Sequence, residues 1–315
     1  MFQVTILGSG AALPVIAQDF RRYPTAQLVS LPHTHLLIDC GEGTQMRLQE
    51  LRIKINRIKH IFISHLHGDH YLGLIGLLSS MHLNKRNQDL YLYGPEGLAE
   101  IIRVQLKYSH TRFNYKIHFQ ELKTGVAEEV LNDGMFSVTT IPLNHRIPCN
   151  GFLVKENPKK RKIIKEKIPQ DIWEWQYAKV LQKGEDVHDE DGNVLISAKE
   201  FTVQPKSRSY AYCSDTSYFE PIIEQIKGVD LLYHEATFTN EEKDRATDTF
   251  HSTAFQAATI AAKAEVGRLI IGHFSSRYRN NLEPLLREAR QRFPNSFLAI
   301  EGASFVLEKE NLPIV

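Results

Sequence analysis

Four potential metal ligands fall within six residues of one loop, and this loop constrains the chain more than any other feature. They are His65, His67, Asp69 and His70, in the stretch SHLHGDH at residues 64–70. The loop follows Ile61–Ser64, an apolar run that predicts a buried strand. In an extended loop the first two histidines point the same way, and Gly68 lets the chain turn so that the last two ligands face elsewhere. The loop therefore predicts a site for two cations.

The ligand types narrow the choice of metal. Imidazole nitrogen together with carboxylate oxygen suits zinc, with manganese or iron also possible. Asp69 also stands where the N-cap of a helix would be, because Tyr71–Leu83 is apolar and long enough to be helical. The alternative is a chance cluster of histidines on a surface turn, and the strand–loop–helix context argues against it.

Composition sets the broad class. A chain of 315 residues, 42% hydrophobic and 24% charged, fits a soluble globular protein of one large domain or two ordinary ones. Its three cysteines form no CxxC pair, which favours a reducing compartment. We see no signal peptide and no apolar run of membrane-spanning length, so we expect a cytoplasmic protein with no membrane span.

Strand-like and helical runs alternate along most of the chain. Strands dominate the early half, and helices are interleaved in both halves. This pattern predicts an α/β protein with a layered αββα sandwich, in which loops at the strand ends carry the chemistry. The expected helices after residue 200 are Tyr218–Ile226, Phe255–Ala264 and Leu282–Phe293.

Residues 155–204 interrupt this alternation. Residues 155–167, KENPKKRKIIKEK, hold seven basic and two acidic side chains, and the chain then stays mostly polar to about Pro205. We interpret residues 155–204 as an insertion that protrudes from a single domain spanning residues 1–315. A long solvated loop is the alternative.

The pattern HxHxDH is the signature of the metallo-β-lactamase superfamily, which this chain resembles over nearly its whole length. The superfamily also has a distal histidine, a bridging aspartate and a final histidine, each after a strand. His145 after Thr139–Leu143, Asp215 after Tyr210–Ser214 and His273 after Leu269–Gly272 match these positions in order.

Further motifs resemble those of the ribonuclease Z family, the endonucleases that process the 3′ end of tRNA. They are LGSGAALP at the start, IDCGEGTQ at residues 38–45, PKSR at 205–208, SDT at 214–216, YHEAT at 233–237, HST at 251–253 and GHFSSRY at 272–278. The resemblance covers about residues 1–155 and 203–307. It implies the metallo-β-lactamase fold and a zinc-dependent endoribonuclease that removes the 3′ trailer from precursor tRNA, leaving a 3′-hydroxyl on the tRNA.

The same resemblance implies roles for individual residues. His65, His67 and His145 would hold one zinc ion, Asp69, His70 and His273 a second, and Asp215 would bridge them. Asp69 would also handle the proton of the attacking water. A pair of His251 and Glu235 would protonate the leaving oxygen, although each could instead have a purely structural role. Phosphate contacts would come from Lys206, Arg208 and Arg277, and a homodimer is expected.

The insertion departs from the family pattern. Short members of the family carry an RNA-binding arm there, tipped with a Gly-Pro-rich segment that grips the tRNA elbow. The equivalent stretch in this chain, residues 167–173, reads KIPQDIW and lacks the Gly-Pro pair. The position, length and basic charge of an arm are retained.

Other functions remain open at this stage. A related phosphodiesterase acting on a small or cyclic nucleotide, or a 3′ exoribonuclease, would use the same ligands, but a small substrate has no need of a basic arm. A β-lactamase or thioester hydrolase would not need the His251–Glu235 pair. A non-catalytic RNA-binding module is a third alternative, and the complete ligand set argues against it because unused buried polar groups are costly.

Overall fold

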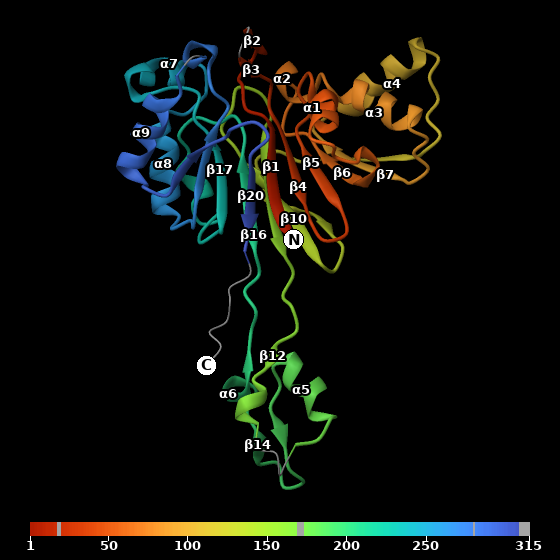
Figure 1. The fold of residues 1–315 in the computed structure, drawn as a ribbon, viewed down its shortest axis with the longest axis vertical. Coiled ribbons are helices and arrows are strands. Elements are labelled where there is room, and N and C mark those ends of the chain that lie inside the picture. Colours follow the sequence, from red (N-terminus) through yellow and green to blue (C-terminus); the bar gives the residue numbers. More distant parts are fainter. Residues whose placement is uncertain (18–19, 169–172, 280, 309–315) are drawn as a thin grey trace.

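The computed structural model describes residues 1–17, 20–168, 173–279 and 281–308, and its centre is a pair of seven-stranded sheets (Figure 1). The first sheet has the order β20 (Ser304–Leu307), β1 (Phe2–Gly8), β4 (Ala26–Ser30), β5 (His35–Ile38), β6 (Ile58–Phe62), β7 (Leu90–Gly94) and β8 (Ile117–Glu121). The second has the order β19 (Ser296–Leu298), β18 (Leu269–Gly272), β17 (Leu231–Glu235), β16 (Ser209–Cys213), β11 (Asn150–Glu156), β10 (Phe136–Pro142) and β9 (Glu129–Asn132).

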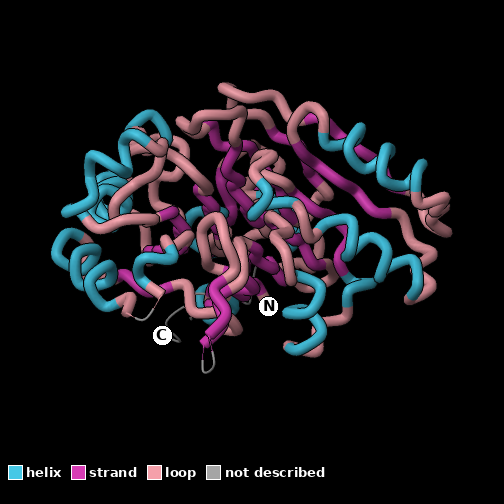
Figure 2. The backbone as a smooth tube through the Cα atoms, turned by 90° about the horizontal axis from the view of Figure 1, so that it is seen from above, coloured by secondary structure: helices cyan, strands magenta, loops and turns pink. Residues whose placement is uncertain are grey.

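Helices cover the outer flanks of the two sheets, as Figure 2 shows from above. On one flank lie α1 (Thr44–Glu50), α3 (Leu74–Leu83) and α4 (Leu98–Tyr108), and on the other α7 (Lys243–Asp248), α8 (Ala254–Lys263) and α9 (Glu283–Arg292). The predicted αββα sandwich is confirmed. No helix in the described part of the chain is both long and apolar enough to cross a bilayer.

Strand β5 illustrates why the central strands are apolar without interruption. Leu36 and Ile38 belong to the core that includes residues of both sheets, whereas Leu37 belongs to the core that includes α1, α3 and α4. All three side chains are fully buried. A strand covered on both faces needs apolar residues at every position, so its sequence loses the usual alternation.

The strand directions place one set of loops at a single edge of the sandwich. Strands β5 to β8 are parallel, and so are β16 to β19. Strand β10 runs in the same direction as β16 because both are antiparallel to β11. The loops that follow β5, β6, β10, β16, β17 and β18 are the ones that carry the predicted site residues.

The predicted helix Tyr71–Leu83 is divided in two. A short α2 (Gly68–Tyr71) is followed by α3, and the break is at Leu72 and Gly73. A Cβ at Gly73 would lie 2.1 Å from the carbonyl oxygen of Gly41, and the Gly73 amide donates to the Cys40 carbonyl. The tight approach of these two segments therefore requires glycine there. Asp69 consequently lies inside α2 and is not its N-cap, which is His67.

The predicted helix Tyr218–Ile226 is mostly turn. Only the 3-10 helix Glu220–Ile222 forms, with Pro221 in its first turn. A hairpin of β2 (Val15–Ala17) and β3 (Phe20–Arg22) forms a further, separate sheet.

The insertion forms an arm that projects from the sandwich at the end opposite α2 (Figure 1). It contains β12 (Lys162–Ile163), α5 (Tyr177–Lys183), β13 (Val187–His188), β14 (Val194–Ile196), α6 (Ala198–Phe201) and β15 (Thr202–Val203). Its buried side chains form a separate small core of Leu181, Val187, Ile196 and Ala198. Most of the segment expected to replace the Gly-Pro tip, residues 169–172, lies outside the described residues.

A buried ion pair lies where the arm joins the sheet. Arg208, just before β16, donates from Nε to Oε2 of Glu156 at 2.9 Å and from its terminal nitrogens to Oε1 of Glu156 and the Leu307 carbonyl. Both residues are about 5% exposed. Burial alone would raise the pKa of Glu156, but Arg208 and Lys159 more than offset this and lower it to about 2.

We predict that Arg208→Met destabilises the protein by about 3 kcal/mol, because it leaves the Glu156 carboxylate buried without its main partner. Urea unfolding at pH 7 measures this loss. The matched control is Lys206→Met, which removes a half-exposed partner of Asp230 and should cost under about 1 kcal/mol.

The difference in the free energy of unfolding between wild type and Arg208→Met should also depend on pH. The folded pKa of Glu156 is depressed, so its contribution is present above the ordinary value near 4.5 and is lost as the pH falls toward 2. Two results would contradict this account. One is an equal loss of stability in Arg208→Met and Lys206→Met, and the other is a stability difference between wild type and Arg208→Met that stays the same at acidic pH.

Candidate metal centre

The loops at the carboxyl ends of four strands bring seven side chains together at one edge of the sandwich. They are His65, His67, Asp69 and His70 after β6, His145 after β10, Asp215 after β16 and His273 after β18. All seven residues predicted as ligands therefore lie within one cluster, although the chain separates them by up to 208 residues.

The first group surrounds a common point with three ring nitrogens. Nδ1 of His67 lies 3.1 Å from Nε2 of His65 and 3.1 Å from Nε2 of His145. Zinc–nitrogen bonds of about 2.0–2.1 Å in a tetrahedron separate neighbouring nitrogens by about 3.3 Å. Both distances are close to this value, so the three nitrogens can share one tetrahedral cation.

The second group contains Asp69, His70 and His273. Nε2 of His273 lies 3.3 Å from Nε2 of His70 and 3.3 Å from Oδ2 of Asp69. Oδ2 of Asp69 also accepts a hydrogen bond from the Ala12 amide at 2.7 Å, which fixes its direction. The backbone of His273 has φ +58°, a left-handed value that a non-glycine residue adopts only when its surroundings impose it.

Asp215 divides its two carboxylate oxygens between the two groups. Oδ2 lies 3.5 Å from Nε2 of His65 and 3.8 Å from Nε2 of His145. Oδ1 lies 3.3 Å from Nε2 of His70 and 3.2 Å from Nε2 of His273. Asp215 is 2% exposed, so this carboxylate is held almost entirely away from water.

The far nitrogens of four histidines have acceptors that set their tautomers. Nδ1–H of His65 donates to Ser64 Oγ at 3.0 Å, and that of His145 to the Phe250 carbonyl at 3.0 Å. His70 and His273 are held in the same way by Asp39 and Thr237. With Nδ1 as the donor, each ring can turn an unprotonated Nε2 toward the centre, which is the state that metal ligation requires.

In this arrangement of protons, lone pairs of histidine nitrogens face the lone pairs of a buried Asp215 oxygen, and a cation between them would remove the repulsion. The buried Oδ1 of Asp215 has no hydrogen-bond donor among the described residues. In the tautomers above, the two nearest nitrogens, those of His70 and His273, present lone pairs to this oxygen. Buried polar atoms without partners are costly. The donor set therefore fits divalent metal ions.

Asp39 organises the buried side of the centre. Its Oδ2 accepts from Nδ1 of His70 at 2.8 Å, from Ser64 Oγ at 2.9 Å and from the Tyr212 hydroxyl at 2.6 Å, while Oδ1 accepts from the Ser64 amide. Asp39 has no exposed surface and a left-handed φ of +57°. In the sequence, Asp39 stands out only as part of the IDCGEGTQ motif at residues 38–45.

Glu235 and His251 form a pair beside the ligands. Nδ1 of His251 lies 2.8 Å from Oε1 of Glu235, which also accepts from the amides of Ser252 and Thr216. Burial lowers the pKa of His251, but the Glu235 carboxylate more than offsets this and raises it to about 9. At neutral pH His251 therefore carries a proton.

The same carboxylate also reaches His273, a candidate metal ligand, through Thr237. The Thr237 hydroxyl donates to Oε2 of Glu235 at 2.9 Å and accepts from Nδ1 of His273 at 2.9 Å. Glu235 is thus connected to both His251 and His273. The ring centroids of these two histidines are 5.3 Å apart.

Two of the three residues predicted to bind phosphate lie elsewhere. Arg208 and Lys206 are at the start of β16, whereas Asp215 follows its end. The prediction for Arg208 is wrong, because its guanidinium is buried against Glu156 and cannot meet RNA. Lys206 is half exposed and pairs with Asp230. Arg277 follows His273 in the 3-10 helix Ser276–Tyr278 and lies 3.9 Å from Glu242.

A cavity of about 480 Å³ opens on the centre. Its lining includes His67, Asp69, Asp215, His273 and His251, together with Arg146, which no motif singled out. Arg146 directly follows the ligand His145 and is exposed, and this adjacency was the one signal in the sequence.

Comparisons with known families and proteins agree with this geometry. Residues 2–156 match the family described as "Anti-Pycsar protein Apyc1", and residues 190–274 match "Beta-lactamase superfamily domain". The protein named Ribonuclease Z of Cytophaga hutchinsonii is 49% identical over 305 residues, which cover 96% of each chain. Its namesake in Bacteroides thetaiotaomicron is 44% identical over 306 residues, 96% of this chain and 94% of that one.

Solved structures show the same similarity. The short form of human tRNase Z has a TM-score of 0.71 and 28% identity, covering 97% of this chain and 99% of that one. The metallo-β-lactamase fold protein YhfI from Bacillus subtilis has a TM-score of 0.66 at 19% identity, covering 96% and 98%, and supports the fold alone.

We predict that Asp39→Asn weakens zinc binding by about 10- to 100-fold, because the amide orients His70 less firmly and no longer raises its basicity. Competition with a chromogenic chelator measures the affinity. Asp89→Asn is the matched control, since Asp89 contacts His118 at the same 2.7–2.8 Å on an exposed surface. Unchanged affinity in folded Asp39→Asn protein would show that Asp39 does not support the metal site.

Proposed function

The chain belongs to the ribonuclease Z family, and on that premise we propose that it is an endoribonuclease that removes the 3′ trailer from precursor tRNA. The cut leaves a 3′-hydroxyl on the tRNA and a 5′-phosphate on the trailer. The observation that carries the proposal is the Asp215 carboxylate, with one oxygen toward each ligand group, beside the protonated pair of His251 and Glu235. This arrangement suits hydrolysis of a phosphodiester with a poor leaving group.

We propose two zinc ions per chain, with manganese or iron as the alternatives that the same donors accept. His65, His67 and His145 would hold one, Asp69, His70 and His273 the other, and Asp215 both. Bound there, the ions supply an activated water at neutral pH and offset the negative charge of the phosphoryl oxygens.

Asp69 and His251 would move the protons. Burial alone raises the pKa of Asp69, but the neighbouring His70 and His273 hold it well below its usual range. Asp69 is therefore ionised and can orient a water by accepting a hydrogen bond from it. His251, whose pKa is about 9, holds a proton that it can donate to the departing 3′ oxygen, and Glu235 keeps its ring in place.

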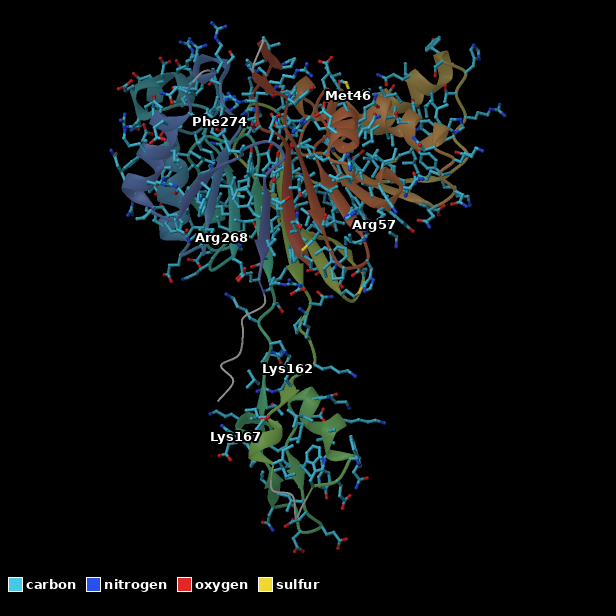
Figure 3. All side chains as sticks on the ribbon, viewed as in Figure 1. Met46, Arg57, Lys162, Lys167, Arg268 and Phe274 are labelled. Carbon is cyan, nitrogen blue, oxygen red and sulfur yellow. The ribbon has the colours of Figure 1, made fainter. Side chains whose placement is uncertain are left out.

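The arm would bind RNA through its basic stretch. Lys160 and Lys162 are exposed, and Figure 3 shows Lys162 and Lys167 on the arm. The turn between β13 and β14 carries Asp189, Glu190 and Asp191, so the positive charge is concentrated in residues 155–167. Phosphates of the tRNA would meet that stretch, away from the metal centre.

We further propose a homodimer in a reducing compartment, the cytoplasm. Three exposed apolar side chains support a dimer contact around α1 and α3: Met46 on α1 (labelled in Figure 3), Leu72 just before α3, and Leu83 at the end of α3. Cys40, Cys149 and Cys213 are unpaired and buried. Sedimentation equilibrium giving a monomer, or fewer than three free thiols after denaturation without reductant, would argue against these two proposals.

Mapping the products of a precursor tRNA that carries a 3′ trailer tests the function. We expect one cut near the end of the acceptor stem and a trailer released in one piece with its 5′-phosphate. Release of the trailer as mononucleotides would identify an exonuclease. No cleavage by protein with its metals bound would contradict the proposal.

We predict that His251→Ala lowers kcat on precursor tRNA by about 10²–10⁴-fold while zinc content stays the same. The variant removes a proton donor but none of the seven proposed ligands. On bis(4-nitrophenyl) phosphate, whose leaving group is already acidic, the loss should be much smaller. Glu235→Gln should give a smaller loss in the same direction. Equal losses on both substrates, or loss of zinc, would assign His251 a structural role.

Replacing residues 160–203 with a short Gly-Ser linker tests the arm. Binding of precursor tRNA should weaken and its salt dependence should flatten, because fewer phosphate contacts release fewer counterions. Hydrolysis of bis(4-nitrophenyl) phosphate should persist. Lys160→Gln with Lys162→Gln should flatten the salt dependence in part, whereas Glu190→Gln with Asp191→Asn should not. Loss of small-substrate activity with the metals retained would place the arm in the active site.

A further inference from the structure

The cavity on the metal centre offers RNA one permanent cation. Of the described residues that line it, Arg146 is the sole lysine or arginine. A volume of about 480 Å³ accommodates roughly one nucleotide. The scissile phosphate would lie at the ligands, so a lining residue at the mouth of the cavity faces the neighbouring part of the strand.

The two residues that directly precede Arg146 are fixed by hydrogen bonds to other loops. Asn144 accepts from the Ser217 amide at 2.9 Å, and the His145 ring donates to the Phe250 carbonyl at 3.0 Å. Arg146 therefore projects from a segment that is already ordered by its neighbours. Such anchoring reduces the entropy that a side chain loses on meeting a ligand.

Within the described part of the chain, the interaction of the Arg146 guanidinium is a through-space one: burial is the largest cause that lowers the pKa of His67, and the charge of Arg146 is the smallest of several. The guanidinium makes no hydrogen bond or ion pair there, and Glu42, which lines the same cavity, is not paired with it. An arginine on an open surface needs no partner. This one, however, lies in a cavity that receives a polyanion, where a planar guanidinium binds phosphate oxygens in pairs.

We propose that Arg146 binds the phosphate immediately on the tRNA side of the scissile phosphate and so positions the strand for cleavage. The inference rests on the proposed function and assigns a residue that the motifs do not. It also replaces Arg208, which burial excludes.

The choice of side follows from the position of His251. This histidine would protonate the 3′ oxygen, which belongs to the last nucleotide of the tRNA. The rings of His251 and His145 are 5.5 Å apart, and the His145 loop is bonded to Phe250. Arg146 directly follows His145 and lines the same cavity as His251, so the inference assigns to Arg146 the phosphate upstream of that 3′ oxygen.

Precursor tRNAs with one neutral methylphosphonate linkage test this assignment. The linkage replaces a phosphate one position upstream or one position downstream of the cut, on a 2′-deoxy residue. Matched 2′-deoxy phosphodiesters are the substrate controls. The proteins are wild type, Arg146→Ala, Arg146→Lys and Arg103→Ala, an exposed arginine on α4 away from the centre. Zinc content and bis(4-nitrophenyl) phosphate hydrolysis are measured on the same samples.

We expect Arg146→Ala to lower kcat/KM on precursor tRNA by about 10- to 100-fold, the usual size of one charge-assisted contact. Arg146→Lys should recover part of this loss, and Arg103→Ala should show none. The loss of kcat/KM caused by Arg146→Ala should fall below about 3-fold on the substrate with the upstream methylphosphonate. It should persist on the substrate with the downstream methylphosphonate. The loss on the small ester, which has no upstream phosphate, should be much smaller than the loss on precursor tRNA.

Three results would overturn the inference. They are an undiminished loss on the upstream methylphosphonate, an equal loss on the small ester, and no loss on precursor tRNA. Failure of the wild type to cleave any precursor tRNA would instead remove the proposed function and this inference with it. The wild-type control therefore distinguishes the two failures.

Discussion

The carboxylate of Asp215 is the interaction on which the centre depends. It lies between two groups of nitrogen and oxygen donors that come from three other strand ends, and each of its oxygens faces one group. Without cations, the buried oxygen nearest His70 and His273 has no donor among the described residues. The fold therefore places many lone pairs close together, and bound metal ions would stabilise this arrangement.

The sandwich makes this possible because parallel strands end at a common edge. Rigid strands set the positions of the loops, and a layer of hydrogen bonds behind the ligands sets the direction of each ring. Asp39 holds His70, and Glu235 reaches His273 through Thr237. Glu235 also binds His251, so the same carboxylate supports a ligand and the proposed acid.

Local sequence predicted the parts of the site that are close together in the chain. The spacing in SHLHGDH indicated a site for two cations, whereas His145, Asp215 and His273 were assigned to it by their match, in order, to the metallo-β-lactamase superfamily. Long-range contacts were beyond such reasoning. The break in helix Tyr71–Leu83 comes from the approach of Gly41 to Gly73, and the burial of Arg208 comes from Glu156, 52 residues away. Strand β4, whose sequence AQLVS shows no clear pattern, was not predicted because its neighbours β1 and β5 define it.

The central claim is that Asp215 holds two metal ions in one centre. Native mass spectrometry of gently purified protein counts the ions bound to each folded chain. The account predicts two ions in the wild type and in Asp89→Asn, and at most one in Asp215→Asn, with the fold retained. Fewer than two ions in active wild-type protein, or two ions retained by Asp215→Asn, would contradict it.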